Sequence, residues 1–568
     1  MFRDVSTLGG SIAKTPYSRI AALAPVFLLH AAALILLVVT EPSLIGAGIF
    51  LLVWIMLNCL GLALVRRPAI VALISLEILL TLTLLSRFKF DKLWMTVDFI
   101  DAMIIDRDTT AFLLAVFPSL RWWIALAAIA NVVAVAIAWL PDRRRISARQ
   151  CLAGFFASAV ALTAVSLLWP TGLTEDFEDR SYVSKFARTG VEAVYELMTR
   201  GYLDVDTAGR AAEQPMAAAG QTCLPPRKLP HILLLHDESS FDLAAVSEVR
   251  VPAGYHRHFQ SFDGKSRKLR VEGVGGPSWF TEFNVLTGLS VRSFGRFATS
   301  VTRIAAGHVF RGLPRTLSGC GYQTFSLYPF YGSFIGSRAF QTTAGIARYL
   351  DMNDLGTTDF EPDSFYYDRA IDLIARERNS GPLFVYIYTV ANHFPWDKQL
   401  RPELTPDWRN LGNPPNVEEY IRRQAMSAQD YRQLLSQLRN AFPTESFLIV
   451  RYGDHQPQFA PRLLGASSGE TAPAKRAEGA DPRNLTTYYA VDAVNFTPVD
   501  VSSALDVLDA PYLPLVALQA AGVPLDASFS AQGAILQRCG GSFYSCGQGA
   551  EARRFNRLLI DEGMIKGL

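Results

Sequence analysis

The chain has 568 residues, of which 50% are hydrophobic, and its formal net charge is +2. A hydrophobic fraction this high is unusual for a wholly soluble protein, and the length predicts more than one domain. Because no long stripe of lysine and arginine stands out, the charge gives no reason to expect a nucleic-acid partner.

The hydrophobic excess lies almost entirely before Pro170, in five apolar runs that each approach the ~20 residues needed to cross a bilayer. The runs are 20–40, 44–65, 69–85, 122–140 and 151–169. They predict five membrane helices. Since a long polar leader precedes the first run and more runs follow it, a retained anchor is favoured over a cleaved signal peptide.

Positive charges alternate between the connections of these runs. Before the first run lie Arg3, Lys14 and Arg19, and between the second and third runs lie Arg66 and Arg67. The connection between the fourth and fifth runs carries Arg143, Arg144, Arg145 and Arg149. This alternation predicts a multi-pass protein of the cell (inner) membrane, with a cytoplasmic amino terminus and a periplasmic domain after Trp169. The charged connection 87–121 breaks the pattern, and its apolar residues interleaved with acids favour a segment lying on the membrane surface over a plain loop.

Composition divides the chain into three regions. Residues 1–170 are predicted to form the transmembrane domain, 171–228 an amphipathic helix followed by an Ala- and Gly-rich linker, and 229–568 an extracytoplasmic domain. In the polar part of the chain, Cys223, Cys320, Cys539 and Cys546 would form two disulfides or remain as buried thiols; Cys539 with Cys546 is the favoured pair.

Beyond residue 229, short apolar runs alternate with segments of helical length, which predicts an α/β domain with a mostly parallel central sheet. The predicted strands are 231–235, 268–271, 322–327, 383–389 and 447–450. Residues 366–378 and 417–442 are predicted helices, and 464–484 is a predicted surface loop.

Polar side chains follow these strands where parallel strands would bring them to one edge of the sheet. They are Asp237, Glu238, Ser278, His393, Asp454 and His455. Carboxylate oxygens and an imidazole nitrogen suit a divalent cation, which would activate the otherwise weak nucleophile Ser278. His393 would protonate a leaving oxygen or hold a phosphate. A helix cap at Glu238 and an ordinary turn at 275–277 are the structural alternatives.

Four stretches carry a resemblance to a known family. They are Glu238-Ser239, Gly276-x-Ser278-x-x-x-Glu282-Phe283, Asn392-His393-Phe394-Pro395 and Gly453-Asp454-His455. Their order resembles the sulfatase-like branch of the alkaline phosphatase superfamily. The resemblance covers about 230–457; it is closest to lipoteichoic acid synthase and the phosphoglycerol transferases, and more distant from the phosphoethanolamine transferases.

The resemblance implies one divalent ion, Mn²⁺ or Zn²⁺, held by Glu238, Ser278, Asp454 and His455. Ser278 would form a covalent phospho-enzyme, while His393 and Arg338 would bind the substrate. Two departures leave alternatives open. The nucleophile is usually a threonine, which makes Thr281 a rival, and Asp237 is an unusual neighbour of Glu238 that would act as a ligand or support one.

The implied function is transfer of a phosphoglycerol or phosphoethanolamine head group, by way of Ser278, from a phospholipid in the outer leaflet to an envelope glycan or lipid. The alternative is a phosphoric or sulfuric ester hydrolase, although no sulfatase pattern of Cys or Ser, then Pro, then Arg surrounds Ser278. A membrane sensor with a decayed site would lack a metal ligand, and none of the four is missing.

Overall fold

The computed structural model describes residues 24–93, 95–105, 107–139, 147–172, 175, 178–206, 223, 228–246, 248–273, 275–464 and 482–568. The amino-terminal leader, the basic run 143–145, the linker 207–221 and most of the loop 464–484 lie outside them. The described residues divide into two compact units, drawn from Met1–Phe99 with Phe117–Glu192 and from Ile100–Val116 with Ala193–Leu568.

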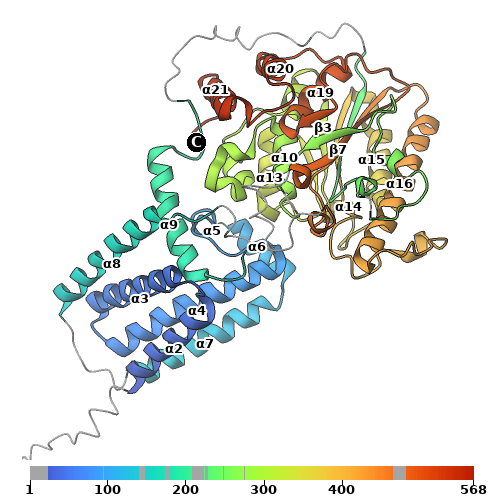
Figure 1. Cartoon of the computed structure of the whole chain (residues 1–568). Coiled ribbons are helices and arrows are strands. Elements are labelled where there is room, and N and C mark those ends of the chain that lie inside the picture. Colours follow the sequence, from blue (N-terminus) through green and yellow to red (C-terminus); the bar gives the residue numbers. More distant parts are fainter. Residues whose placement is uncertain are drawn as a thin grey trace, which may run out of the picture. The chain divides into compact units, whose positions relative to one another are not determined.

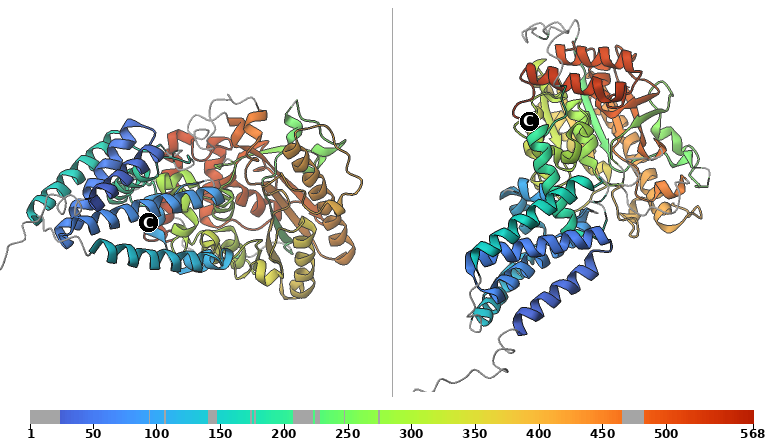
Figure 2. Two further views of the ribbon diagram at one scale, coloured as in Figure 1. Left: turned by 90° about the horizontal axis from the view of Figure 1, so that it is seen from below. Right: turned by 60° about the vertical axis from the view of Figure 1, so that its left-hand side comes forward.

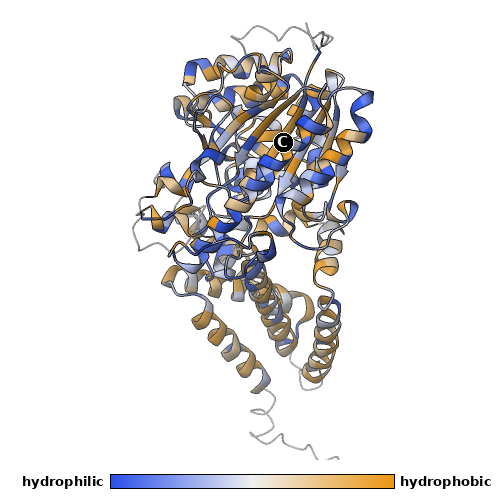
Figure 3. Cartoon of the chain, turned by 90° about the vertical axis from the view of Figure 1, so that its right-hand side faces the viewer, coloured by the Kyte–Doolittle hydropathy of each residue, from blue (hydrophilic) through white to orange (hydrophobic). Residues whose placement is uncertain are grey.

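The first unit is built from apolar helices, which are orange in Figure 3. Helices α3 (Leu44–Val65), α4 (Pro68–Leu93), α7 (Leu120–Trp139) and α8 (Ala148–Leu168) are long and apolar enough to cross a membrane. The expectation of five such helices is wrong by one. The described part of α2 (Ala24–Thr40) has 17 residues, which rise about 26 Å, less than the ~30 Å hydrocarbon core.

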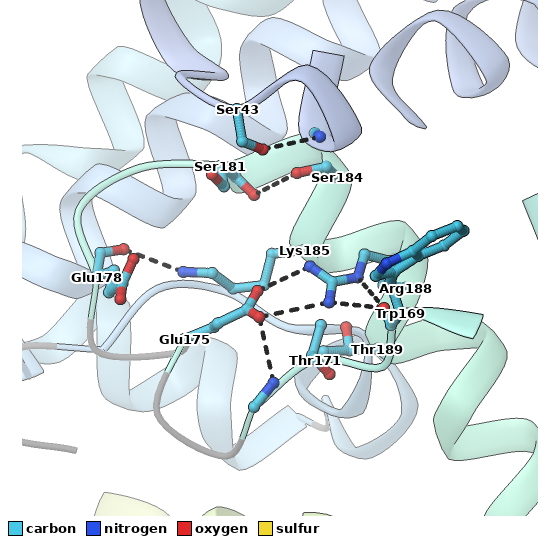
Figure 4. A network of polar contacts seen from close by, with 12 residues as sticks. Ser43, Trp169, Thr171, Glu175, Glu178, Ser181, Ser184, Lys185, Arg188 and Thr189 are labelled. Atoms are coloured by element: carbon cyan, nitrogen blue, oxygen red, sulfur yellow. Dashed lines mark hydrogen bonds and ion pairs between the residues drawn. The ribbon is translucent and has the colours of Figure 1, made fainter. Parts of the chain in front are cut away.

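A polar network fixes the start of helix α9 (Tyr182–Thr199) within this unit (Figure 4). Glu41, between α2 and α3, accepts hydrogen bonds from the backbone N–H groups of Val183 and Ser184 and from the Ser184 hydroxyl. Arg188 binds Glu175 and the carbonyl of Trp169, at the end of α8. A carboxylate at a helix start satisfies N–H groups that have no partner inside the helix, so Glu41 anchors α9.

Two short helices, α5 (Phe99–Ile104) and α6 (Arg107–Val116), occupy the connection between α4 and α7. Helix α6 belongs to the second unit, where the ring of Phe112 lies 6.1 Å from that of Tyr331 and 5.5 Å from that of Phe334. The connection therefore contains helices and is not a plain loop, while its position on the membrane surface stays a prediction.

An eight-stranded sheet forms the centre of the second unit, in the order β4-β3-β5-β1-β6-β7-β2-β8. The strands are β1 (His231–Asp237), β2 (Arg267–Arg270), β3 (Gln323–Leu327), β4 (Arg348–Leu350), β5 (Leu383–Thr389), β6 (Phe447–Gly453), β7 (Thr486–Val494) and β8 (Val507–Asp509). Of these strands, β7 alone runs against the others. The predicted mostly parallel α/β sheet is confirmed.

Helices cover both faces of this sheet (Figures 1 and 2). Helices α15 (Asp363–Glu377) and α16 (Pro415–Ala441) lie on one face, and α10 (Ser278–Thr287), α12 (Leu313–Gly319) and α19 (Leu513–Ala521) on the other. The remaining α-helices of this unit are α11 (Val301–Ala305), α13 (Ser337–Ala344), α14 (Met352–Leu355), α17 (Ala460–Leu463), α20 (Ala527–Cys539) and α21 (Ala550–Asp561). Because the central strands are buried on both faces, their sequences are continuous apolar runs.

Disulfides join Cys223 to Cys320 and Cys539 to Cys546, while Cys59 and Cys151 are free. The first disulfide ties the segment before β1 to the end of α12. The sequence had left disulfides and buried thiols as equal alternatives for these four residues, and the structure selects the disulfides.

Candidate active site

The candidate site begins where β1 ends, at Glu238. The next residue, Ser239, has a φ of 52°, a left-handed conformation that is rare for residues other than glycine and asparagine. This bend lets the Ser239 N–H donate to Asp454 Oδ1 at 2.7 Å, and the Ser239 hydroxyl donate to Glu238 Oε1 at 2.8 Å. The ends of β1 and β6 are thus joined through the backbone of Ser239.

Asp454 and His455 follow β6, which pairs with β1 in parallel. Asp454 Oδ1 accepts a second hydrogen bond, at 2.8 Å, from the N–H of His455. The strand ends in Gly453, where an added Cβ would lie 2.0 Å from the carbonyl oxygen of Ser240. With Oδ1 fixed by two N–H groups, the Asp454 carboxylate has one orientation.

Ser278 is the first residue of α10 and reaches the same place from the turn after β2. Its hydroxyl donates to Glu238 Oε2 at 3.0 Å and lies 3.1 Å from His455 Nε2. The positive end of the helix dipole at this position favours negative charge on the serine oxygen. The structure therefore brings together the four residues predicted as metal ligands.

The spacing of these atoms fits a shared divalent ion. His455 Nε2 lies 3.4 Å from both Glu238 Oε1 and Asp454 Oδ2. Ligands at about 2.0–2.2 Å from a tetrahedral zinc are separated by roughly 3.3–3.6 Å. The four side chains are almost completely buried, and their nitrogen and oxygen donors suit Zn²⁺ or Mn²⁺.

The electrostatics of the site also favour a cation. Burial lowers the pKa of His455, but the Asp454 and Glu238 carboxylates outweigh it and raise that pKa to about 9. Burial would raise the pKa of Glu238, yet the hydrogen bond with His455 and the nearby histidines hold it well below its ordinary value. The buried, ionised carboxylate of Glu238 requires a compensating positive charge.

One residue at this site was not predicted. His236, two positions before Glu238, is fully buried, and its Nε2 lies 3.1 Å from Asp454 Oδ2. Donor atoms of His236, Glu238 and Asp454 all lie within 4.8 Å of one another. The signal was present in the sequence, since residues two apart on a strand share a face.

Asp237 and Thr281, which the sequence left open as a further ligand and a rival nucleophile, have other hydrogen-bond partners in the structure. The Tyr488 hydroxyl donates to Asp237, whose Oδ2 lies 4.0 Å from His258 Nε2. Thr281 is fully buried, and its hydroxyl donates to the backbone carbonyl of Asp454 at 2.6 Å. Neither geometry matches that of Ser278, whose hydroxyl contacts Glu238 and His455 directly.

The two predicted substrate-binding residues have different surroundings. His393 follows β5, is half-buried, and has its ring 5.9 Å from Phe330 and 4.9 Å from Phe360. Its charge contributes to the low pKa of Glu238, so it lies within electrostatic reach of the donors. Arg338, on α13, forms an ion pair with Asp351 at 2.7 Å and stacks on Tyr349.

A family comparison covers the centre of the second unit. Residues 280–484 match the family model described as Sulfatase. The matched region is similar to sulfatases, and the α/β domain that contains it, residues 229–568, is named the sulfatase-family domain for that similarity. The matched range includes His393, Asp454 and His455 and begins just after Ser278. The expected resemblance to the sulfatase-like enzymes of the alkaline phosphatase superfamily is therefore confirmed.

Several solved structures are similar to parts of this chain at low sequence identity. The phosphoglycerol transferase of Streptococcus pyogenes is 14% identical, with a TM-score of 0.46 over 60% of this chain and 91% of its own. A lipoteichoic acid synthase of Listeria monocytogenes is 14% identical, with a TM-score of 0.38 over 59% and 78%. The lipooligosaccharide phosphoethanolamine transferase A of Neisseria meningitidis is 11% identical, with a TM-score of 0.43 over 90% and 96%.

A curated relative is similar over a shorter stretch. An uncharacterized protein of Haemophilus influenzae is 24% identical over 241 residues, which cover 39% of this chain and 40% of that protein. The match therefore spans well under half of the relative's length.

Proposed function

We propose that the chain is a membrane-anchored, metal-dependent transferase that moves a phosphoglycerol or phosphoethanolamine head group from a phospholipid to an envelope glycan or lipid. The observation that carries this proposal is the position of the Ser278 hydroxyl, within 3.1 Å of both Glu238 and His455. When bound by Glu238, Ser278, Asp454 and His455, Mn²⁺ or Zn²⁺ would lower the pKa of the serine hydroxyl and neutralise phosphoryl charge.

The reaction has two half-steps. In the first, Ser278 Oγ, which has already lost its proton to solvent, attacks the phosphorus of the donor lipid. The bond from phosphorus to the diacylglycerol oxygen breaks, and a protonated His393 gives that oxygen its proton. In the second, His393 takes the proton of an acceptor hydroxyl, which attacks the phosphorus and releases Ser278. The same imidazole thus acts as acid and then as base. Arg338, which is half-exposed beyond its ion pair, remains a proposed contact to the substrate.

The location proposed for this reaction is the outer face of the cell (inner) membrane. Among the described residues, four helices have membrane-spanning length, and the alternation of arginines predicts a periplasmic sulfatase-family domain. Two disulfides in that domain support an oxidising compartment. A donor in the outer leaflet would then be available to the site.

The decisive experiment is intact-mass analysis of the full chain in detergent, supplied with Mn²⁺ or Zn²⁺ and a mixture of phosphatidylglycerol and phosphatidylethanolamine. We expect an added phosphoglycerol or phosphoethanolamine that is absent in Ser278→Ala and retained in Thr281→Ala. An adduct that is lost in Thr281→Ala but not in Ser278→Ala would identify Thr281, and not Ser278, as the nucleophile. Cleavage of a phosphodiester without any transfer to an acceptor would show that the protein is a hydrolase and not a transferase.

A further inference from the structure

Two buried polar atoms at the site lack a hydrogen-bond partner among the described residues. They are His236 Nε2 and Asp454 Oδ2, which lie 3.1 Å apart. Both side chains are fully buried. Leaving such atoms unpaired costs free energy, and native proteins rarely do so.

A hydrogen bond between these two atoms does not account for them. Their separation is short enough, but the pair does not meet the geometry of an N–H···O bond, and each atom remains without a hydrogen-bond partner among the described residues. A cation bound by both would satisfy the lone pair of the nitrogen and the charge of the oxygen. Glu238 lies within 4.8 Å of both and adds a third donor.

We propose that His236 is a further nitrogen ligand of the divalent ion that the proposed function places at Glu238, Ser278, Asp454 and His455. The inference rests on that ion and extends its ligand set. Two imidazoles, His236 and His455, would then share the site with two carboxylates and the serine oxygen. Because imidazole suits zinc while magnesium and manganese favour oxygen ligands, this set prefers Zn²⁺ over Mn²⁺.

The surroundings of His236 hold its ring in the orientation that a ligand needs. Nδ1 lies 2.8 Å from the Tyr386 hydroxyl and 3.0 Å from that of Tyr452. A proton on Nδ1, donated to either oxygen, would leave Nε2 free to bind a metal. Tyr388 stacks on the ring at 3.8 Å, and its hydroxyl donates to Glu238 Oε2 at 2.7 Å. One tyrosine thus contacts both proposed ligands.

Metal affinity of the full chain in detergent tests this inference without any measurement of activity. Titration with Zn²⁺ and Mn²⁺ would be compared in the wild type and His236→Gln. His231→Asn is the matched control, because His231 is also buried on β1 but pairs with Glu445. We expect His236→Gln to weaken zinc binding at least about tenfold and to reduce the preference for zinc, while His231→Asn leaves both unchanged. Equal zinc affinity in His236→Gln and the wild type would overturn the inference.

A second measurement on the wild type does not depend on how the variant folds. Pulsed EPR of the Mn²⁺-loaded chain, with and without ¹⁵N-labelled histidine, counts the coordinated imidazole nitrogens. Two nitrogens are expected. One nitrogen would overturn the inference that two imidazoles bind the ion and would leave the proposed function intact, whereas a wild type that binds no divalent ion at this site would overturn both.

Discussion

Asp454 shows how single atoms define this site. Two backbone N–H groups, from Ser239 and His455, occupy Oδ1. Oδ2 is left between the imidazoles of His236 and His455, at 3.1 and 3.4 Å. A carboxylate held in this way needs no rearrangement to accept a cation, so the geometry is preorganised for binding.

Removal of the Tyr388 hydroxyl tests the importance of the groups around the ligands. Tyr388→Phe keeps the ring that stacks on His236 but removes the hydrogen bond to Glu238 Oε2. We expect metal affinity to fall about tenfold, because a ligand without its supporting hydrogen bond is less well oriented. Calorimetric titration measures the effect. Tyr322→Phe is the control, since that hydroxyl is also buried but binds the carbonyl of Pro230; equal affinities in the two variants would contradict the prediction.

Asp363 should make stability depend on pH. Burial and the charges of Asp237 and Asp430 raise its pKa from 3.8 to about 8. Between those values the unfolded chain ionises this carboxyl and the folded chain does not, so its contribution to stability is complete below pH 3.8 and lost as pH rises toward 8. The loss is about 1.4 kcal/mol per pH unit.

Asp363→Asn removes this titration, so its melting temperature in detergent should fall less than that of the wild type between pH 5 and pH 8. Asp368→Asn is the control, because Asp368 is exposed on the same helix α15. If the melting temperature falls equally with pH in the wild type and in Asp363→Asn, the buried carboxyl does not resist ionisation.

At the level of elements, continuous apolar runs predicted the central strands. β1, β5 and β6 are buried on both faces, and such strands have a strong sequence signal. The strands β4 and β8, of three residues each, were missed because pairing with neighbours, and not an apolar pattern, defines so short a strand. β7 was also missed, although Tyr488, Tyr489 and Val491 are buried in it.

The site was predictable to the extent that its residues lie in local motifs. Glu238, Ser278, Asp454 and His455 each follow a strand or begin a helix, and the sequence placed them together. Tyr388 and the partners of His236 could not be assigned in this way. Tyr386 and Tyr388 each lie 150 residues from the β1 group they contact, so strand pairing in the fold is needed to bring them there.

Gly453, at the end of β6, is a position where the backbone of a neighbouring segment leaves no room for a side chain. A Cβ added there would lie 2.0 Å from the carbonyl oxygen of Ser240, and backbone atoms cannot move away as a flexible side chain could. Gly453→Ala should therefore separate the ends of β1 and β6, abolish metal binding and lower the melting temperature. Gly319→Ala, on α12 with nothing within 4 Å of the added Cβ, should leave both unchanged. Metal binding retained in Gly453→Ala would contradict this account.

At the scale of the whole molecule, a disulfide connects distant parts of the chain. Cys223 and Cys320 are separated by 97 residues, whereas Cys539 and Cys546 are separated by seven. In the chain-entropy model, closing the longer loop stabilises the folded state by about 4.7 kcal/mol and closing the shorter one by about 2.5 kcal/mol. The long-range disulfide should therefore matter more for the stability of the sulfatase-family domain.

Replacement of both cysteines of a pair by serine tests which disulfide stabilises the fold more, and labelling of the same cysteines tests the proposed compartment. The Cys223→Ser, Cys320→Ser variant should melt lower in detergent than the Cys539→Ser, Cys546→Ser variant. In intact cells, a thiol reagent should label none of these four cysteines unless a reductant is added first, because an oxidising compartment keeps disulfides formed. Labelling of wild-type Cys223 or Cys320 without reductant would place the domain in a reducing compartment and reverse the predicted membrane orientation.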